Sequence, residues 1–442
     1  MLVSEDPTTD TRVRREAVSA ANTFEVTVIG IDYTHGPPRP DLEIDGYRIV
    51  YVRKRPLPIV SCLRRLDGKS FSIRERLLLF LCALILPIIG IPLLIVLPFL
   101  VIGRALFPVF PRLRRIYHVP GFRWIFFLWT LKNIFQFTDA LVSGFEALGI
   151  DADVIHANDL DTLLAGALIK ARHAPRLVYD AHELWPVQDP FAPWYHVRFF
   201  RWFEKKLIKN ADTVFTVSEP LAHIMKEWYG SANVSLLPNA LPYRKGIKVK
   251  DGGIGRLGGD RVKFLYHGGF LPGRGIETLI HIWSQIDTSK AVLFLRGADC
   301  PYKTELKKIA RQVVKGDGVY FLDAVPLDDV VPAAMEADIG VIPYEPVCLN
   351  NEFSCPNKLS EYMQAGLLLL VNRRLVNVEK IVTKYKCGLA YDPDDDAQTL
   401  AVISELISNS RLRNRLRINA RRAARDQYNW ASFEDVLLEA YR

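Results

Sequence analysis

The sequence is poor in cysteine and lacks several short motifs that mark common enzyme sites. Six cysteines occur among 442 residues, and no two of them form a C-x-x-C pair. This usage argues against a disulfide framework or a zinc site and favours a reducing, cytosolic setting. A P-loop, an H-E-x-x-H motif and a serine nucleophile elbow are also missing. The carboxylates are scattered, so we expect no metal site.

Apolar periodicity is missing from residues 1–22, which are polar and mixed in charge. They lack the apolar core that a signal peptide needs. We therefore predict that 1–22 is a disordered N-terminal tail.

Charge is absent from residues 77–103, the most apolar stretch of the chain. Basic residues crowd 48–76 on one side of this stretch and recur from 104 to 123 on the other. The net charge is +8, and basic flanks around an apolar run favour an anionic membrane surface over nucleic acid.

A simple membrane span does not fit this stretch. Pro87, Pro92 and Pro98 interrupt it, and proline breaks or kinks a helix. Basic flanks on both sides place both ends on the cytoplasmic side. We predict a membrane-associated insertion at 61–140 with a re-entrant hairpin at 77–103, on the cytoplasmic face of the cell membrane. A buried core helix pair is the alternative.

The aromatic stretch 124–137 either lies in the membrane interface or packs on a sheet, and we favour packing.

The rest of the chain alternates apolar strand patterns with helical ones, which predicts α/β domains with doubly wound parallel sheets. Residues 23–242 form one Rossmann-like domain and 261–425 a second. The Gly-, Lys- and Asp-rich stretch 243–260 is the predicted linker, and 426–442 is a helix that packs back on the first domain. Ligands bind beyond the carboxyl ends of such strands, so we expect both domains to face a cleft.

The stretch PNKLSEYMQAG, residues 356–366, follows a strand pattern and a loop. Pro356 suits a helix start and Gly366 a helix end. Lys358 and Glu361 share one helix face near the N-terminus, where an anion is favoured. A phosphate and a sugar diol would satisfy this pair. On spacing alone, a surface helix with an ion pair explains it equally well.

A second candidate is the turn His267-Gly268-Gly269, which follows the first strand of the second domain, with Arg274 at the next helix start. Glycine there lets a ligand approach the backbone, and arginine pairs with phosphate. This turn does not meet the G-x-G-x-x-G fingerprint, which argues against an NAD enzyme. A plain tight turn is the alternative.

Two neighbouring strand ends of the first domain carry polar side chains suited to acid/base chemistry or hydroxyl binding. These are His182 with Asp180 and Glu183, and His156 with Asn158 and Asp159.

Together these motifs resemble the retaining glycosyltransferases of family 4, which have the two-domain GT-B fold. PNKLSEYMQAG is similar to the donor motif of that family and HGGFLPGRG to its glycine loop. VYDAHELWP, HANDLDTLLAG, TVSEPL and LLPNAL resemble N-terminal landmarks of one branch. The resemblance covers about 24–60 and 150–442.

The resemblance implies roles for the matching residues in the second domain. Gly268 and Gly269 would approach the donor diphosphate, and Arg274 and Lys358 would neutralise it. Glu361 would bind the nucleotide ribose. The full set implied for the donor is Gly268, Gly269, Arg274, Asn357, Lys358 and Glu361. The donor would be a nucleotide-sugar, UDP- or GDP-linked, with no further cofactor.

The implied catalytic residues are His182, Asp180, Arg274 and Lys358. The implied acceptor residues are His156, Asn158, Asp159, His182 and Glu183. The apolar insertion suggests a lipid-linked glycan or a lipid as acceptor, in polysaccharide or glycolipid biosynthesis. One position departs from the family: Phe353 stands where a glutamate is usual, and Glu352 is one residue off. A non-catalytic, membrane-bound partner subunit with the same fold is therefore the alternative function.

Overall fold

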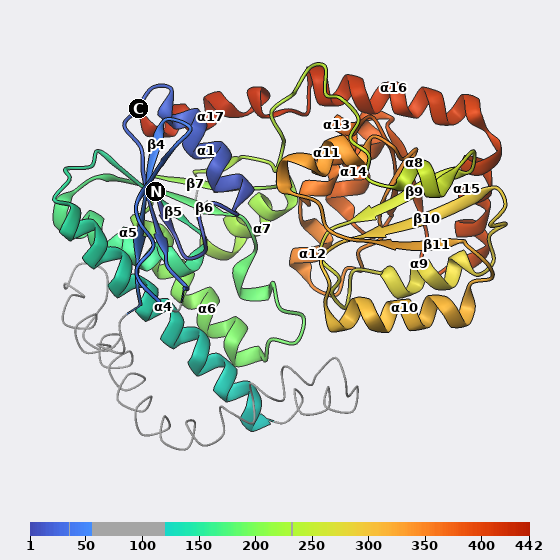
Figure 1. Cartoon of the computed structure of the whole chain (residues 1–442). Helices are drawn as coiled ribbons and strands as arrows, with labels where there is room; N and C mark the ends of the chain where they lie inside the picture. Colours follow the sequence, from blue (N-terminus) through green and yellow to red (C-terminus); the bar gives the residue numbers. More distant parts are fainter. Residues whose placement is uncertain (35, 55–119, 231–232) are drawn as a thin grey trace. The chain divides into compact units, whose positions relative to one another are not determined.

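The structure is a computed structural model that describes residues 1–34, 36–54, 120–230 and 233–442 (Figure 1). The predictions for 55–119, including the hairpin at 77–103, lie outside these residues. The chain divides into two compact units. The first comprises Met1–Leu237 and Glu434–Arg442, and the second comprises Pro238–Phe433.

The first unit is built on a sheet in the order β3-β4-β2-β1-β5-β6-β7-β8 among the described residues. Only β3 is antiparallel to its neighbour in this sheet, and the other pairs are parallel. The strands are β1 (Leu2–Val3), β2 (Thr27–Ile31), β3 (Leu42–Ile44), β4 (Tyr47–Val52), β5 (Val154–Asn158), β6 (Arg176–Ala181), β7 (Thr213–Thr216) and β8 (Val234–Leu236).

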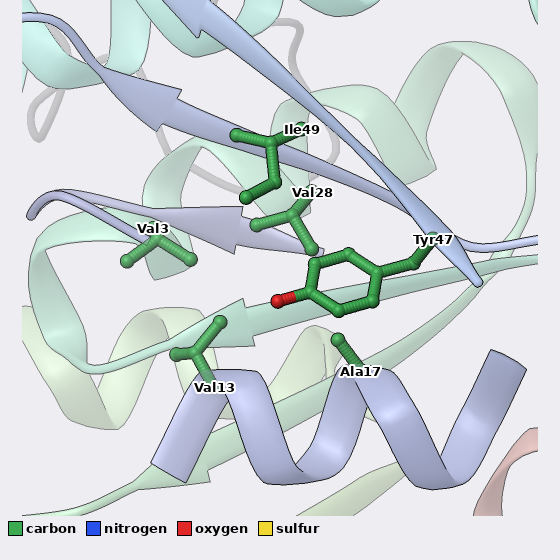
Figure 2. Close-up of a cluster of buried hydrophobic side chains, with 6 residues drawn as sticks. All are labelled: Val3, Val13, Ala17, Val28, Tyr47 and Ile49. Carbon is green, nitrogen blue, oxygen red and sulfur yellow. The ribbon is translucent and has the colours of Figure 1, made fainter. Parts of the chain in front are cut away.

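The predicted disordered tail at 1–22 is wrong. Strand β1 lies between β2 and β5 in the sheet, and helix α1 (Thr11–Ala21) follows it. Asp10 caps α1 by accepting hydrogen bonds from the backbone N–H groups of Arg12 and Val13. Figure 2 shows Val13 and Ala17 of α1 facing Val3 and side chains of β2 and β4 in a buried cluster.

The remaining helices of the first unit cover both sheet faces. Helix α4 (Pro120–Leu148) packs on β2 and on α5. Within the stretch 124–137, Leu131, Ile134 and Phe135 are buried, whereas Trp124 and Trp129 are exposed. At Gly144 the backbone comes so close that an added Cβ would lie 2.4 Å from Val52. No helix in the described part of the chain is both long and apolar enough to cross a membrane. The other helices are α5 (Leu160–His173), α6 (Trp194–Leu207), α7 (Glu219–Tyr229) and α17 (Glu434–Tyr441).

The second unit has a fully parallel sheet in the order β11-β10-β9-β12-β13-β14. Numbered within the unit, this order is 3-2-1-4-5-6, the doubly wound Rossmann topology. The chain order reverses between β9 and β12, which is where such sheets bind ligands. The strands are β9 (Val262–His267), β10 (Ala291–Arg296), β11 (Val319–Leu322), β12 (Ile339–Ile342), β13 (Leu368–Asn372) and β14 (Gly388–Tyr391).

The predicted linker 243–260 belongs to the second unit, whose boundary with the first lies at Leu237 and Pro238. Glu336 accepts hydrogen bonds from the backbone of Gly252 and Ile254, which ties this stretch to the unit. The helices here are α8 (Ile254–Gly258), α9 (Ile276–Trp283), α10 (Pro301–Val313), α11 (Val330–Ala334), α12 (Leu349–Phe353), α13 (Asn357–Ala365), α14 (Val376–Tyr385), α15 (Asp396–Ser408) and α16 (Ser410–Asp426).

Candidate functional site

The switch point of the second unit brings the glycine turn and the predicted donor motif together. Gly268 directly follows β9 with φ +123, a conformation that L side chains rarely adopt. A Cβ at this position would lie 2.5 Å from Lys358 Nζ. The backbone therefore requires glycine at 268, and a side chain there would also displace the Lys358 ammonium group.

Helix α13 holds Lys358 in its first turn. Pro356 precedes the helix in extended conformation, and Gly366 ends it with φ +73. No side chain caps this helix start, and the helix dipole favours an anion there.

Two cations converge on Tyr344, which follows β12. Lys358 Nζ donates to the Tyr344 hydroxyl at 2.6 Å, and the Arg274 guanidinium carbon lies 4.1 Å from the centroid of the Tyr344 ring. Among the described residues, no carboxylate comes within 4.0 Å of either cation. Positive charge concentrated at a helix start and a glycine turn, without an acidic partner, suits a phosphate group.

Glu361 lies one turn further along α13 and pairs with His267 at the end of β9. The distance from His267 Nε2 to Glu361 Oε2 is 2.7 Å. Burial lowers the pKa of His267. Burial would raise the pKa of Glu361, but the His267 hydrogen bond and the charge of Lys358 lower it. Because an ionised carboxylate only accepts hydrogen bonds, His267 Nε2 is the donor, and the second carboxylate oxygen remains able to accept from a sugar hydroxyl.

The structure thus brings together four predicted donor residues, Gly268, Arg274, Lys358 and Glu361. Gly269 adjoins them, with no atom within 4 Å of an added Cβ, and Asn357 is exposed at the start of α13. His267 was part of the predicted turn but was given no role, and Tyr344 was not predicted. His267 ends β9 and Tyr344 lies two residues after β12, so their place at the switch point was the available signal.

In the first unit, His182 lies between two carboxylates beyond β6. Its Nδ1 is 3.2 Å from Asp159 Oδ2, and its Nε2 is 3.1 Å from Asp180 Oδ2. Burial of the imidazole disfavours its charged form, but the two carboxylates outweigh this and raise the pKa of His182 well above its usual value. Both ring nitrogens are occupied, so in this conformation His182 offers no free nitrogen to a substrate.

Arg12 of α1 holds the Asp180 carboxylate in place. Its Nε and Nη2 donate to the two oxygens of Asp180, each at 2.7 Å, and its Nη1 donates to the Leu237 carbonyl. Glu16, one turn along α1, lies 2.9 Å from Arg12 Nε. Burial raises the pKa of Glu16 to about 8.

Asp180 and His156 are placed differently from the prediction. Asp180 is 0 % exposed and His156 is 2 % exposed, so neither side chain reaches a surface where it would touch an acceptor. His156 Nδ1 lies 2.5 Å from the Tyr441 hydroxyl of α17. Because their partners are interior groups, Asp180 and His156 can act only by positioning others. Asn158 is also buried and donates to the Leu2 carbonyl, and Glu183 is half-buried beside His182.

Asp161 lies in the first turn of α5 and not at its N-cap position. Asp159 occupies that position, with φ +59 and without a side-chain hydrogen bond to the helix. Its carboxylate instead accepts from the His182 backbone N–H at 3.1 Å.

One group of possible metal ligands occurs in the described residues. Ligand atoms of Glu16, His156 and Asp180 lie within 4.8 Å of one another. The Arg12 guanidinium already pairs with both carboxylates, so an interior ion-pair network accounts for the group.

Two family models match the chain. Glycosyltransferase Family 4 matches residues 100–243, and Glycosyl transferases group 1 matches residues 253–423. These two domains indicate a GT-B glycosyltransferase. The first match begins after β1, α1 and β2, so the segment that carries Arg12 lies outside both matched ranges.

Solved structures share the fold of this glycosyltransferase. Sucrose-phosphate synthase from Thermosynechococcus elongatus superposes with a TM-score of 0.69 at 15% identity, covering 100% of this chain and 97% of that one. A trehalose-6-phosphate structure from E. coli bound with UDP-2-fluoro glucose has a TM-score of 0.64 at 10% identity, covering 100% and 98%. Anabaena HepE in complex with UDP has a TM-score of 0.55 at 16% identity, covering 67% and 80%. No curated protein gives a significant match.

Proposed function

We propose that the chain transfers a sugar from a nucleotide-sugar, UDP- or GDP-linked, to a lipid-linked or membrane-associated acceptor at the cytoplasmic face of the cell membrane. Transfer proceeds with retention of configuration and without a metal, in polysaccharide or glycolipid biosynthesis. The observation that carries the proposal is the set of two cations, Lys358 and Arg274, beside the Glu361–His267 pair at the switch point of the second unit.

Each part of this set matches one part of the donor. Lys358, Arg274 and the start of α13 offer positive charge to the diphosphate, whose charge grows as the bond to the sugar breaks. Glu361, held as a carboxylate by His267, accepts hydrogen bonds from the ribose. Two of the structures that share the fold hold UDP or a UDP-sugar, which supports a nucleotide donor.

The evidence for a membrane-associated acceptor comes from the sequence. The uncharged run 77–103 and its basic flanks support a membrane-associated acceptor. Full activity on soluble acceptors alone, in a chain that lacks 77–103, would overturn this part of the proposal.

A panel of UDP-, GDP- and ADP-sugars tests the activity. We expect one donor to be hydrolysed or transferred, with the anomeric configuration of the product retained by NMR. Arg274→Ala should slow the reaction by about 2.7–4 kcal/mol of barrier, the range for removing one preorganised charge-stabilising donor. Arg256→Ala is the matched control, because Arg256 is exposed on α8 of the same unit. Tight donor binding without turnover on any sugar would instead favour a non-catalytic partner subunit, which Phe353 makes a specific alternative.

A further inference from the structure

Large aromatic side chains are exposed where α4 and α6 begin. Trp194, the first residue of α6, is 75 % exposed, Phe191 in the preceding loop is 53 % exposed, and Trp124 in the first turns of α4 is 51 % exposed. Exposed tryptophan in such a group is unusual for a surface that faces only water.

Tyr195 joins these rings into one surface. It stacks on Trp124 at 4.5 Å between centroids and meets Trp194 edge-on at 5.8 Å. Beneath it, Phe127 of α4 contacts Phe199 and Phe200 of α6. Figure 1 shows the two helices alongside each other. The exposed rings therefore sit on a rigid aromatic base.

The outer face of α6 is basic. Arg198 and Lys205 are exposed. Arg198 lies four residues after Trp194, and Lys205 lies seven residues after Arg198, so the three share one face of the helix. Neither cation has an ion pair or hydrogen bond within the described part of the chain. The one carboxylate of α6, Glu204, is buried and accepts hydrogen bonds from Tyr179 and Tyr229. The face thus presents positive charge without compensation.

This surface lies at the same edge of the sheet as His182. Helices α4 and α6 lead into the parallel strands β5 and β7, so both helices begin at the carboxyl edge. Trp185, three residues after His182, packs on Phe200 of α6 at 4.7 Å. The acceptor residues and the aromatic rings are therefore parts of one end of the unit.

We propose that Trp124, Phe191, Trp194, Arg198 and Lys205 form a docking surface for a bilayer that carries anionic lipid. Tryptophan rings settle at the headgroup level, and arginine and lysine pair with anionic headgroups. Charge complementarity selects the bilayer over an apolar protein partner, because an uncompensated basic stripe borders the rings. The inference rests on the proposed function in one respect: docking at this edge would present a lipid-borne acceptor to the side of the sheet that carries His182.

Hydrogen–deuterium exchange of the full chain tests the surface locally. The probes are vesicles of phosphatidylcholine alone and vesicles containing phosphatidylglycerol. We expect peptides from 189–209 to exchange about tenfold more slowly with the anionic vesicles, and peptides of α10 in the second unit to remain unchanged. Unchanged exchange at 189–209 while the protein is vesicle-bound would overturn the proposal, as would equal protection by neutral vesicles or slow exchange already without vesicles.

Charge reversal supplies the matched control. Arg198→Glu with Lys205→Glu should abolish the protection at 189–209, whereas Lys308→Glu with Arg311→Glu, which makes the same charge change on exposed residues of α10, should leave it intact. Protection retained in the first pair would contradict the role of these cations. Donor-sugar hydrolysis measured on both pairs separates the outcomes, because the surface can fail while hydrolysis persists, and hydrolysis can be absent while the surface binds vesicles.

Discussion

Arg12 is the side chain on which the buried charges of the first unit depend. Asp180 is completely buried, and a buried carboxylate is tolerated only where it is paired and hydrogen-bonded. Arg12 donates two hydrogen bonds to it and also forms an ion pair with Glu16. His182 then depends on Asp180 for one of its two carboxylate contacts.

Replacing Arg12 by methionine should therefore lower the free energy of unfolding by about 3–5 kcal/mol, because it breaks a buried ion pair and removes two hydrogen bonds from the Asp180 carboxylate. Urea denaturation followed by circular dichroism measures this. Arg14→Met is the control, since Arg14 is partly exposed and pairs loosely with Asp45 at 3.7 Å; it should cost about 0–1 kcal/mol. Equal losses of unfolding free energy in the two variants would show that the buried contacts of Arg12 add no more stability than an exposed ion pair does.

The charge of His182 can be tested directly. Asp159→Asn removes one of the two carboxylates that raise the pKa of His182 but keeps an oxygen for the His182 backbone N–H. We expect this pKa to fall, as measured by NMR titration of labelled imidazoles and assigned with His182→Asn. A group with a raised folded-state pKa stabilises fully below its unfolded value, about 6.5, and loses this contribution as the pH rises through the folded value. The total loss of stability above about pH 6.5 should accordingly be smaller in Asp159→Asn than in the wild type, and an unchanged loss and an unchanged pKa would contradict the two-carboxylate account.

At the scale of elements, the glycine turn after β9 offers a probe that separates ligand contact from folding. Gly269 has a negative φ and open space around its Cβ position, so Gly269→Ala should leave the melting temperature unchanged. If the donor diphosphate approaches this backbone, the added methyl should weaken UDP or GDP binding about tenfold or more by calorimetry. Gly268→Ala provides the contrast: it meets Lys358 Nζ and imposes a strained φ, so it should lower both stability and binding. Unaltered nucleotide affinity in Gly269→Ala would place the diphosphate elsewhere.

The elements that sequence reasoning found are those whose packing follows simple periodicity. Strands such as β10 and β11 are apolar runs between turn residues, and this alternation with helices is what predicted the α/β domains. The turn at Gly268 and the helix with Lys358 and Glu361 were likewise predictable, because strand ends and glycines mark them. Helix α1 was missed because it buries Arg12, Arg15 and Glu16, and charged residues erase the apolar pattern on which such predictions rest. Their partner, Asp180, is 168 residues away from Arg12, and no local rule connects the two.

For the molecule as a whole, the division into two units separates two kinds of chemistry. The predicted donor residues all belong to Pro238–Phe433, and His182 with its carboxylates belongs to the other unit. Residues 434–442 return to the first unit, where Tyr441 meets His156. Each unit therefore completes its own polar site from its own residues.

This separation predicts that nucleotide binding and transfer can be lost independently. Glu361→Ala should weaken UDP or GDP binding by about 1.5–3 kcal/mol, the range for hydrogen bonds to a charged group, and should reduce transfer with it. His182→Ala should reduce transfer. It should leave the affinity for the free nucleotide within about twofold of the wild type, because none of the predicted donor residues belongs to the unit that contains His182. Calorimetry with the nucleotide and a transfer assay with the matching sugar donor measure the two quantities on the same preparations. Loss of nucleotide affinity in His182→Ala would show that the first unit also holds the nucleotide, and unchanged affinity in Glu361→Ala would remove Glu361 from the donor site.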